Sequence, residues 1–133
     1  MKKEGILNSN LAKIIAGMGH TDKLVICDSG LPIPKSAELV DLALTKNIPR
    51  FIDTLETVLE ELEVESAIIT EEMVNGNPEL FKGIKDLLPK VDFIKVDHEK
   101  FKNMTRKNGN ISFIRTGEVT PYANIILVSG VTF

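Results

Sequence analysis

Five side chains that can exchange protons or bind hydroxyl groups border short apolar segments of this 133-residue chain. They are His20, Asp28, His98, Tyr122 and Asn124. A histidine titrates near neutral pH and can donate or accept a proton. Carboxylate, phenol and amide groups form directional hydrogen bonds with hydroxyl groups. This set suits a polyhydroxylated ligand and general acid–base chemistry.

Each of these residues also has a purely structural interpretation. A single histidine such as His20 is most often a surface or hydrogen-bonded residue, and His98 lies in "DHEK", which is typical of the capped first turn of a helix. Asp28 in "CDSG" could cap a loop, and Tyr122 could be a packed ring with a satisfied hydroxyl. The residues alone leave both interpretations open.

Other chemistries lack the motifs that they require. The "GMG" at 17–19 follows a predicted helix and lacks the third glycine of a dinucleotide fingerprint, and the sequence has no Walker loop, CxxC or HExxH. The two histidines have no spacing typical of a metal site. Cys27 has no base near it in the sequence, and Ser29 does not match a nucleophile elbow. We therefore expect neither a cofactor nor a metal.

The composition is that of a soluble globular protein, with 43% hydrophobic residues, 26% charged residues and a net charge of −3. The basic residues are scattered, so we expect no nucleic-acid partner. No segment approaches the roughly 20 apolar residues of a membrane helix, and the first 20 residues lack the apolar core of a signal peptide. The single cysteine favours a reducing compartment. We expect one cytoplasmic domain over residues 1–133.

Periodicity predicts strands that alternate with helices. We expect helices in "NSNLAKIIAGMGH", "RFIDTLETVLEEL", "NPELFKGIKDLL" and "HEKFKNMTRK". We expect strands in "KLVICDSG", "VESAIIT", "VDFIKV", "NISFIRTGE" and "ANIILVSGVTF". The segment "AELVDLALTKNIP" fits either type. Strands joined through helices imply a mainly parallel sheet, in which one of the last two strands could be antiparallel.

Local signals predict where these elements begin and end. Asn8 or Ser9 can cap the first helix, which Gly17 and Gly19 can end by adopting a positive φ. Asn77 is expected to cap a later helix, and Asn108–Gly109 is expected to form a turn.

The order of the elements separates His20 from Asp28. Ligands of open α/β sheets bind beyond the carboxyl ends of the strands, where Asp28, His98 and the "SG" at 129–130 are expected. His20 precedes its strand and should lie at the opposite edge. A shared site would need either a fold-back of the glycine-rich loop or a second subunit.

Three segments resemble the D-ribose pyranases, a family of ribose mutarotases. The N-terminal third is similar over "KKEGILNSNLAKIIAGMGHTDKLVICDSGLPIP", the middle over "VDLAL…IPRFIDTLETVLEEL" and the C-terminus over "TGEVTPYANIILVSGVTF". The related L-fucose mutarotases share the layout, but "GLPIP" and the C-terminal segment favour the ribose branch. Ser29 departs from the alanine more common in that branch.

The resemblance implies a fold, a site and an assembly. The fold would be a three-layer α/β/α single domain with a mainly parallel, mixed six-stranded sheet that includes "LVDLAL" as a strand. His20 would be the catalytic acid, and Asp28 could orient it or bind a sugar hydroxyl. Sites would lie in clefts between the subunits of pentameric rings, which can stack as decamers. The implied substrate-binding residues are Asp28, His98, Tyr122 and Asn124.

The implied activity is that of a D-ribose pyranase, which interconverts pyranose and furanose forms of D-ribose and supports ribose uptake and catabolism. Ring opening moves one proton off the anomeric hydroxyl and one onto the ring oxygen. General acid–base catalysis contributes about 10²–10⁴-fold, which suffices for a reaction that also proceeds spontaneously. The alternatives are an L-fucose-type mutarotase and a non-catalytic sugar-binding module of a transport system, which would not depend on His20.

Overall fold

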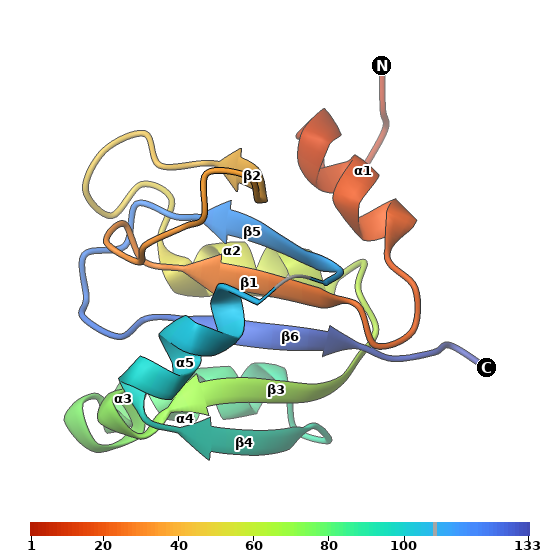
Figure 1. The fold of residues 1–133 in the computed structure, drawn as a ribbon. Helices are drawn as coiled ribbons and strands as arrows, with labels where there is room; N and C mark the ends of the chain where they lie inside the picture. Colours follow the sequence, from red (N-terminus) through yellow and green to blue (C-terminus); the bar gives the residue numbers. More distant parts are fainter. Residues whose placement is uncertain (108) are drawn as a thin grey trace.

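The computed structural model describes residues 1–107 and 109–133, which are organised around one six-stranded sheet (Figure 1). The strands lie in the order β2-β5-β1-β6-β3-β4. They comprise β1 (Lys23–Cys27), β2 (Glu38–Asp41), β3 (Val64–Thr70), β4 (Asp92–Val96), β5 (Ile111–Arg115) and β6 (Ile125–Ser129). β6 runs antiparallel to β1 and β3, whereas the other pairings are parallel. The predicted mainly parallel, mixed sheet is confirmed.

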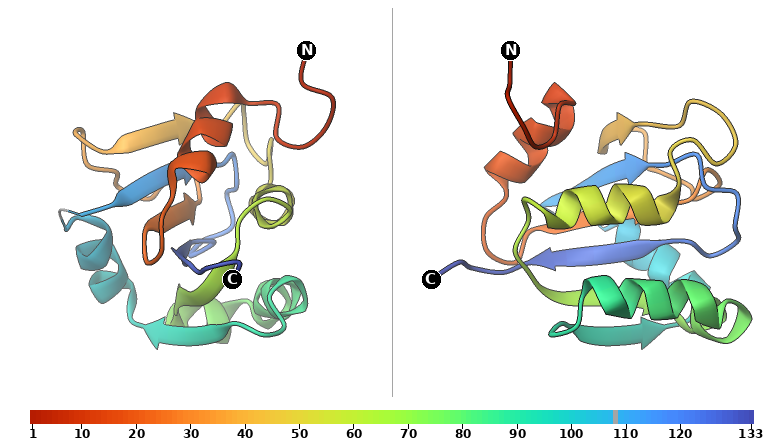
Figure 2. Two further views of the ribbon diagram at one scale, coloured as in Figure 1. Left: turned by 90° about the vertical axis from the view of Figure 1, so that its right-hand side faces the viewer. Right: turned by 180° about the vertical axis from the view of Figure 1, so that it is seen from behind.

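Helices cover both faces of this sheet, as the three-layer prediction requires. They comprise α1 (Ser9–Gly17), α2 (Phe51–Leu59), α3 (Glu71–Gly76), α4 (Pro78–Leu87) and α5 (His98–Thr105). α2 and α4 lie over one face and α5 lies over the other (Figure 2). Of the helices described, none has the length and hydropathy that crossing a membrane needs.

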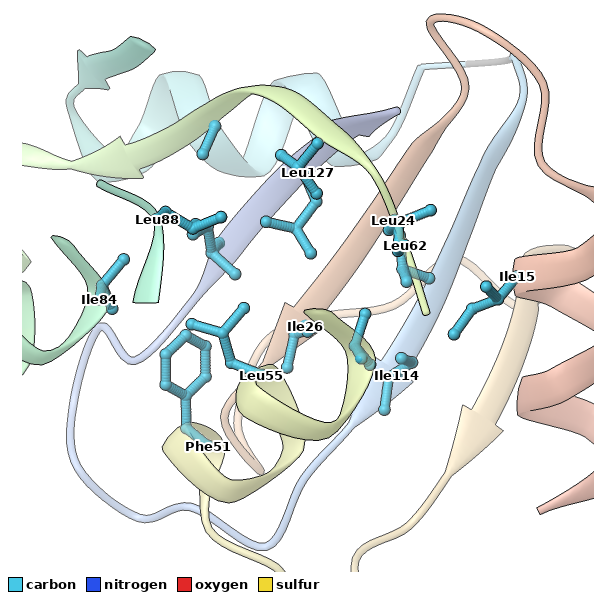
Figure 3. Close-up of a cluster of buried hydrophobic side chains, with 14 of the residues drawn as sticks. Ile15, Leu24, Ile26, Phe51, Leu55, Leu62, Ile84, Leu88, Ile114 and Leu127 are labelled. Atoms are coloured by element: carbon cyan, nitrogen blue, oxygen red, sulfur yellow. The ribbon is translucent and has the colours of Figure 1, made fainter. Parts of the chain in front are cut away.

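Two apolar cores form because the central strands are buried on both faces. In β1, Leu24 and Ile26 join the core under α2 and α4, whereas Val25 and Cys27 join the core under α5. This alternation follows from the two-residue period of a strand. It also explains why "LVIC" is continuously apolar. Figure 3 shows the larger core, in which the β1 side chains meet residues of α2 such as Leu55.

The loop after α1 differs from the prediction. α1 ends at Gly17, but the positive φ expected at Gly17 and Gly19 was wrong, because Gly5 and Gly109 are the glycines of the described residues with positive φ. Instead Thr21 adopts a φ of 70°. The physical reason is the tight loop that forms when the Gly19 N–H donates to Asp22 Oδ2 over 2.9 Å.

The other predicted ends of helices and strands are largely confirmed. Asn77 caps α4 by accepting a hydrogen bond from the Leu80 N–H over 3.1 Å. The ambiguous segment contributes β2, a short edge strand paired only with β5 among the described residues, and its continuation at 42–44 is irregular. The predicted turn at Asn108–Gly109 falls partly outside the described residues. α3 was not predicted.

The buried thiol of Cys27 provides a test of the core. Its desolvation, with a smaller contribution from the nearby Asp28 carboxylate, raises the pKa of Cys27 to about 12. Since the thiolate is the reactive species, we expect the native protein at pH 8 to resist an aromatic disulfide reagent. Unfolding in guanidinium should release one rapidly reacting thiol per chain. Rapid stoichiometric labelling of the native protein would contradict this packing.

Candidate active site

Four of the five predicted site residues lie together at one edge of the sheet. Asp28 follows β1, His98 begins α5 directly after β4, and Tyr122 and Asn124 precede β6. Because β6 is antiparallel, its amino end lies beside the carboxyl ends of β1 and β3. For the same reason the expected placement of the "SG" at 129–130 at this edge was wrong, since Ser129 pairs with Val64 at the start of β3. The four side chains line one cavity of about 300 Å³. That volume is at the lower end of the range of about 300–1,000 Å³ for ligand pockets, as expected for a small ligand.

Asp28 and Asn124 form the fixed polar wall of this cavity. The Asp28 Oδ1 atom accepts hydrogen bonds from the Gly30 and Leu31 N–H groups, each over 2.9 Å. The amide group of Asn124 donates to Asp28 Oδ2 over 3.1 Å and accepts from the Asp28 N–H over 2.9 Å. Asn124 is only 1% exposed. The loop-capping interpretation of Asp28 is therefore confirmed, and it leaves the carboxylate held rigidly at the cavity.

His98 and Tyr122 form the aromatic part of the cavity wall. Their rings meet edge to face, with centroids 5.0 Å apart and an interplanar angle of 80°. His98 lies in the capped first turn of α5, as predicted, because Asp97 caps that helix. Its backbone N–H also donates to Glu72 Oε1 over 3.1 Å. These backbone hydrogen bonds hold the helix end from which the imidazole contacts the phenol.

Tyr122 carries backbone strain at the cavity. It adopts a φ of 64° and is 38% exposed. A positive φ is uncommon for a residue with a bulky side chain, and such strain tends to concentrate at functional sites. Here the turn is closed by the Asn124 N–H, which donates to the Tyr122 carbonyl over 2.8 Å. The strained turn presents both side chains to the same cavity.

His20 lies at the opposite edge, as the order of elements predicted. β1 separates it from Asp28, and five residues at about 3.3 Å each span roughly 17 Å. The His20 Nε2 atom is 2.8 Å from Glu65 Oε2, near the start of β3. The glycine-rich loop does not fold back, since the Thr21 N–H donates to the Ser129 carbonyl at the end of β6 over 2.9 Å. Asp28 therefore does not orient His20 within one subunit.

Sequence reasoning missed Glu65 and Glu72, the carboxylates that contact the two histidines. Glu65 is 45 positions from His20, and Glu72 is 26 positions from His98. No local spacing could signal either contact, because each depends on which strands become neighbours. The side-chain atoms His98 Nδ1 and Glu72 Oε2 are buried without a hydrogen-bond partner in the part of the chain that the structure describes.

A larger cavity of about 500 Å³ lies at the other end of the sheet. Its lining includes Lys13, Asp22 and Arg106 but none of the five candidate residues. We place the candidate site in the smaller cavity, because convergent, hydrogen-bonded polar groups mark a binding site better than volume does.

The described residues contain no group of three or more histidine, cysteine, aspartate or glutamate side chains placed to hold a metal ion. The expected independence from metals and cofactors stays a prediction.

Asp22 allows the loop that carries His20 to be tested. The Gly19 N–H and, to a smaller extent, the Asn110 side chain donate to its carboxylate and lower the pKa of Asp22 below 3.8. The contribution of these hydrogen bonds to the stability of the fold is therefore complete above pH 3.8. It is lost as the pH falls through the pKa of Asp22 in the folded protein. We expect carboxyl NMR titration to give a midpoint below 3.8 that rises in Asn110→Ala. A wild-type midpoint at or above 3.8 would contradict this loop geometry.

This chain is similar to known proteins over its whole length. The family model described as the RbsD / FucU transport protein family matches residues 1–132. The D-ribose pyranase of Coprothermobacter proteolyticus is 52% identical over 133 residues, which are 100% of both chains. The D-ribose pyranase of Clostridium perfringens is 49% identical with the same coverage.

Two solved structures extend these similarities. Bacillus subtilis RbsD complexed with D-ribose has a TM-score of 0.93 and 47% identity, covering 100% of both chains. The fucose mutarotase from Streptococcus pneumoniae in complex with L-fucose has a TM-score of 0.78 over 96% of this chain and 95% of that one. The identity to the latter is 23%, so that likeness concerns the fold alone.

Proposed function

The chain belongs to the RbsD / FucU transport protein family, and on that premise we propose that it is a D-ribose pyranase, an isomerase that interconverts the pyranose and furanose forms of D-ribose. The observation that carries the proposal is the joint placement of Asp28, His98, Tyr122 and Asn124 around one small cavity. That cavity belongs to a chain similar to D-ribose pyranases over its full length. Residues 1–133 would form one sugar-mutarotase domain.

The hydrogen bonds of Asp28 suggest how the cavity binds a sugar. An ionised carboxylate offers about four acceptor sites. Three of them are taken by the Gly30 and Leu31 N–H groups and the Asn124 amide. The remaining site can accept a hydrogen bond from a sugar hydroxyl. Because the other three bonds hold the carboxylate in place, little conformational freedom is lost on binding.

The aromatic pair supplies the remaining contacts. The Tyr122 hydroxyl can donate to or accept from a sugar hydroxyl, and the His98 imidazole can do the same in its neutral form. Their edge-to-face contact keeps both rings in place. The cavity therefore offers several directional hydrogen-bonding groups. These groups suit ribose, which carries a hydroxyl group on almost every carbon.

The reaction is a redistribution of protons that balances without an oxidant or reductant. The anomeric hydroxyl loses its proton as C1–O1 becomes a carbonyl, and the bond between C1 and the ring oxygen breaks while that oxygen gains a proton. A different hydroxyl then attacks C1 and loses its proton while the carbonyl oxygen gains one, which closes the furanose ring. His20 is the proton donor in this proposal, since imidazole changes protonation near neutral pH.

A second subunit would complete the site. His20 and Asp28 of one chain lie at opposite ends of β1, so His20 of a neighbouring copy has to reach the cavity. We infer a pentameric ring, which can stack as a decamer, in a cytoplasmic enzyme that supports ribose uptake and catabolism. Head-to-tail contacts of this kind close into a ring when the rotation that relates neighbouring copies divides a full turn.

The activity can be tested by NMR saturation transfer between pyranose and furanose signals of ribose. The wild-type protein should accelerate exchange, and His20→Ala should lower the rate by about 10²–10⁴-fold, the usual contribution of acid–base catalysis. Asp28→Asn should weaken ribose binding about tenfold, because a neutral amide oxygen accepts a weaker hydrogen bond than a carboxylate. Asp53→Asn, on the exposed side of α2, is the matched control and should match the wild type.

Three outcomes would contradict this assignment. If the protein accelerated exchange between the forms of L-fucose but not between those of ribose, it would be a fucose-type mutarotase. Ribose binding without acceleration would indicate a non-catalytic sugar-binding module. Undiminished acceleration by His20→Ala would remove the histidine from the reaction.

A shared site can be tested by mixing two variants that are both impaired when ribose is assayed below saturation. Light scattering should give a mass of five or ten times the 14.7 kDa of one chain. Unfolded and refolded together in equal amounts, His20→Ala and Asp28→Asn should regain about a quarter of wild-type activity, because one interface in four would then hold both intact residues. Separately refolded and unmixed samples are the control. A monomeric protein, or no recovery in mixed rings, would overturn the shared site.

A further inference from the structure

Among the described residues, the contact between His20 and Glu65 is the one side-chain interaction of the proposed proton donor. The His20 Nε2 atom lies 2.8 Å from Glu65 Oε2, and the two side chains are 52% and 44% exposed. Ion pairs with this exposure add little to stability, because water screens them and side-chain entropy opposes them. The contact therefore matters mainly for how it orients the imidazole.

A β-bulge directs Glu65 toward this contact. Val64 pairs with Ser129 and Ser66 pairs with Val128, so Glu65 is an extra residue with no partner in β6. Bulges redirect side chains and are frequent next to active sites. Gly130 permits the close approach, because a Cβ atom there would lie 3.2 Å from Glu65 Cβ and 3.3 Å from Glu65 N.

The backbone beside His20 is held to the same strand end. The Thr21 N–H donates to the Ser129 carbonyl over 2.9 Å, and Ser129 also pairs with Val64. Thr21 keeps a φ of 70°, which is an outlier for a β-branched residue. The end of β6 thus fixes the loop that carries His20 and the strand that carries Glu65 relative to each other.

No other nearby carboxylate takes this role. Asp22 is occupied by the Gly19 N–H and the Asn110 side chain, with both distances 2.9 Å. Asp28 lies beyond the far end of β1. Among the described residues, Nε2 is the only nitrogen of the His20 ring with a hydrogen bond, and its partner is Glu65.

We propose that Glu65 is a positioning residue that keeps the proton on His20 Nε2 and makes Nδ1 the nitrogen that exchanges a proton with the sugar. An ionised carboxylate can only accept, so Nε2 must carry the shared hydrogen. In the opening step the Nδ1–H bond of the imidazolium breaks and the ring oxygen gains that proton, while water takes the proton of the anomeric hydroxyl. The assignment rests on the proposed function.

The test compares Glu65→Ala and Glu65→Gln with the control Glu63→Ala, an exposed glutamate two residues earlier with no side-chain contact among those observed. Glu65→Ala should lower kcat for ribose exchange about tenfold, a part of the acid–base contribution, with KM changed less than about twofold. Glu65→Gln should recover much of the rate, because its side-chain oxygen still accepts from Nε2–H. Glu63→Ala should match the wild type.

A spectroscopic measurement separates this proposal from the proposed function. Ring ¹⁵N shifts of neutral His20 should show one tautomer, protonated at Nε2, in the wild type and averaged values in Glu65→Ala. If the wild type fails to accelerate exchange, the proposed function is wrong, and these shifts still decide whether Glu65 fixes the ring. Wild-type kcat and unchanged shifts in Glu65→Ala would overturn the positioning role. Loss of the wild-type oligomeric mass in that variant would also overturn it.

Discussion

The antiparallel pairing of β6 with both β1 and β3 is the constraint on which the rest of the structure depends. It inserts one reversed strand between two halves of an otherwise parallel sheet. Its amino end therefore brings Tyr122 and Asn124 to the edge where Asp28 and His98 lie. Its carboxyl end holds the loop of His20 and the bulge of Glu65. One strand thus organises both parts of the proposed catalytic apparatus.

The candidate residues combine structural and chemical roles. Asp28 caps its own loop and still presents a carboxylate to the cavity, and His98 lies in the capped first turn of a helix while it contacts Tyr122. Local hydrogen bonds of this kind fix side chains before a ligand arrives. Preorganised groups lose less entropy on binding than mobile ones. The structural and functional interpretations are therefore compatible here.

Short-range patterns predicted much of the fold, and long-range contacts escaped them. Strands rich in valine and isoleucine, such as β3, and the cap at Asn77 were predictable because their causes lie within a few residues. The positive φ of Thr21 could not be predicted in this way, since it depends on Asp22 and on the end of β6. Glu65 was missed for the same reason, because a bulge appears only once two strands pair. The order of the elements placed Asp28 and His98 at one edge of the sheet, but their grouping with Tyr122 and Asn124 became predictable only through resemblance to a family.

The two outer strands of the sheet restrict how copies of this chain can meet. β2 and β4 each leave one row of backbone hydrogen-bonding groups unpaired among the described residues. Such rows are templates for aggregation unless charges block them. β2 begins and ends with the acidic residues Glu38 and Asp41, and β4 carries Asp92 and Lys95. These charges disfavour the extension of the sheet into fibres through either of its edges.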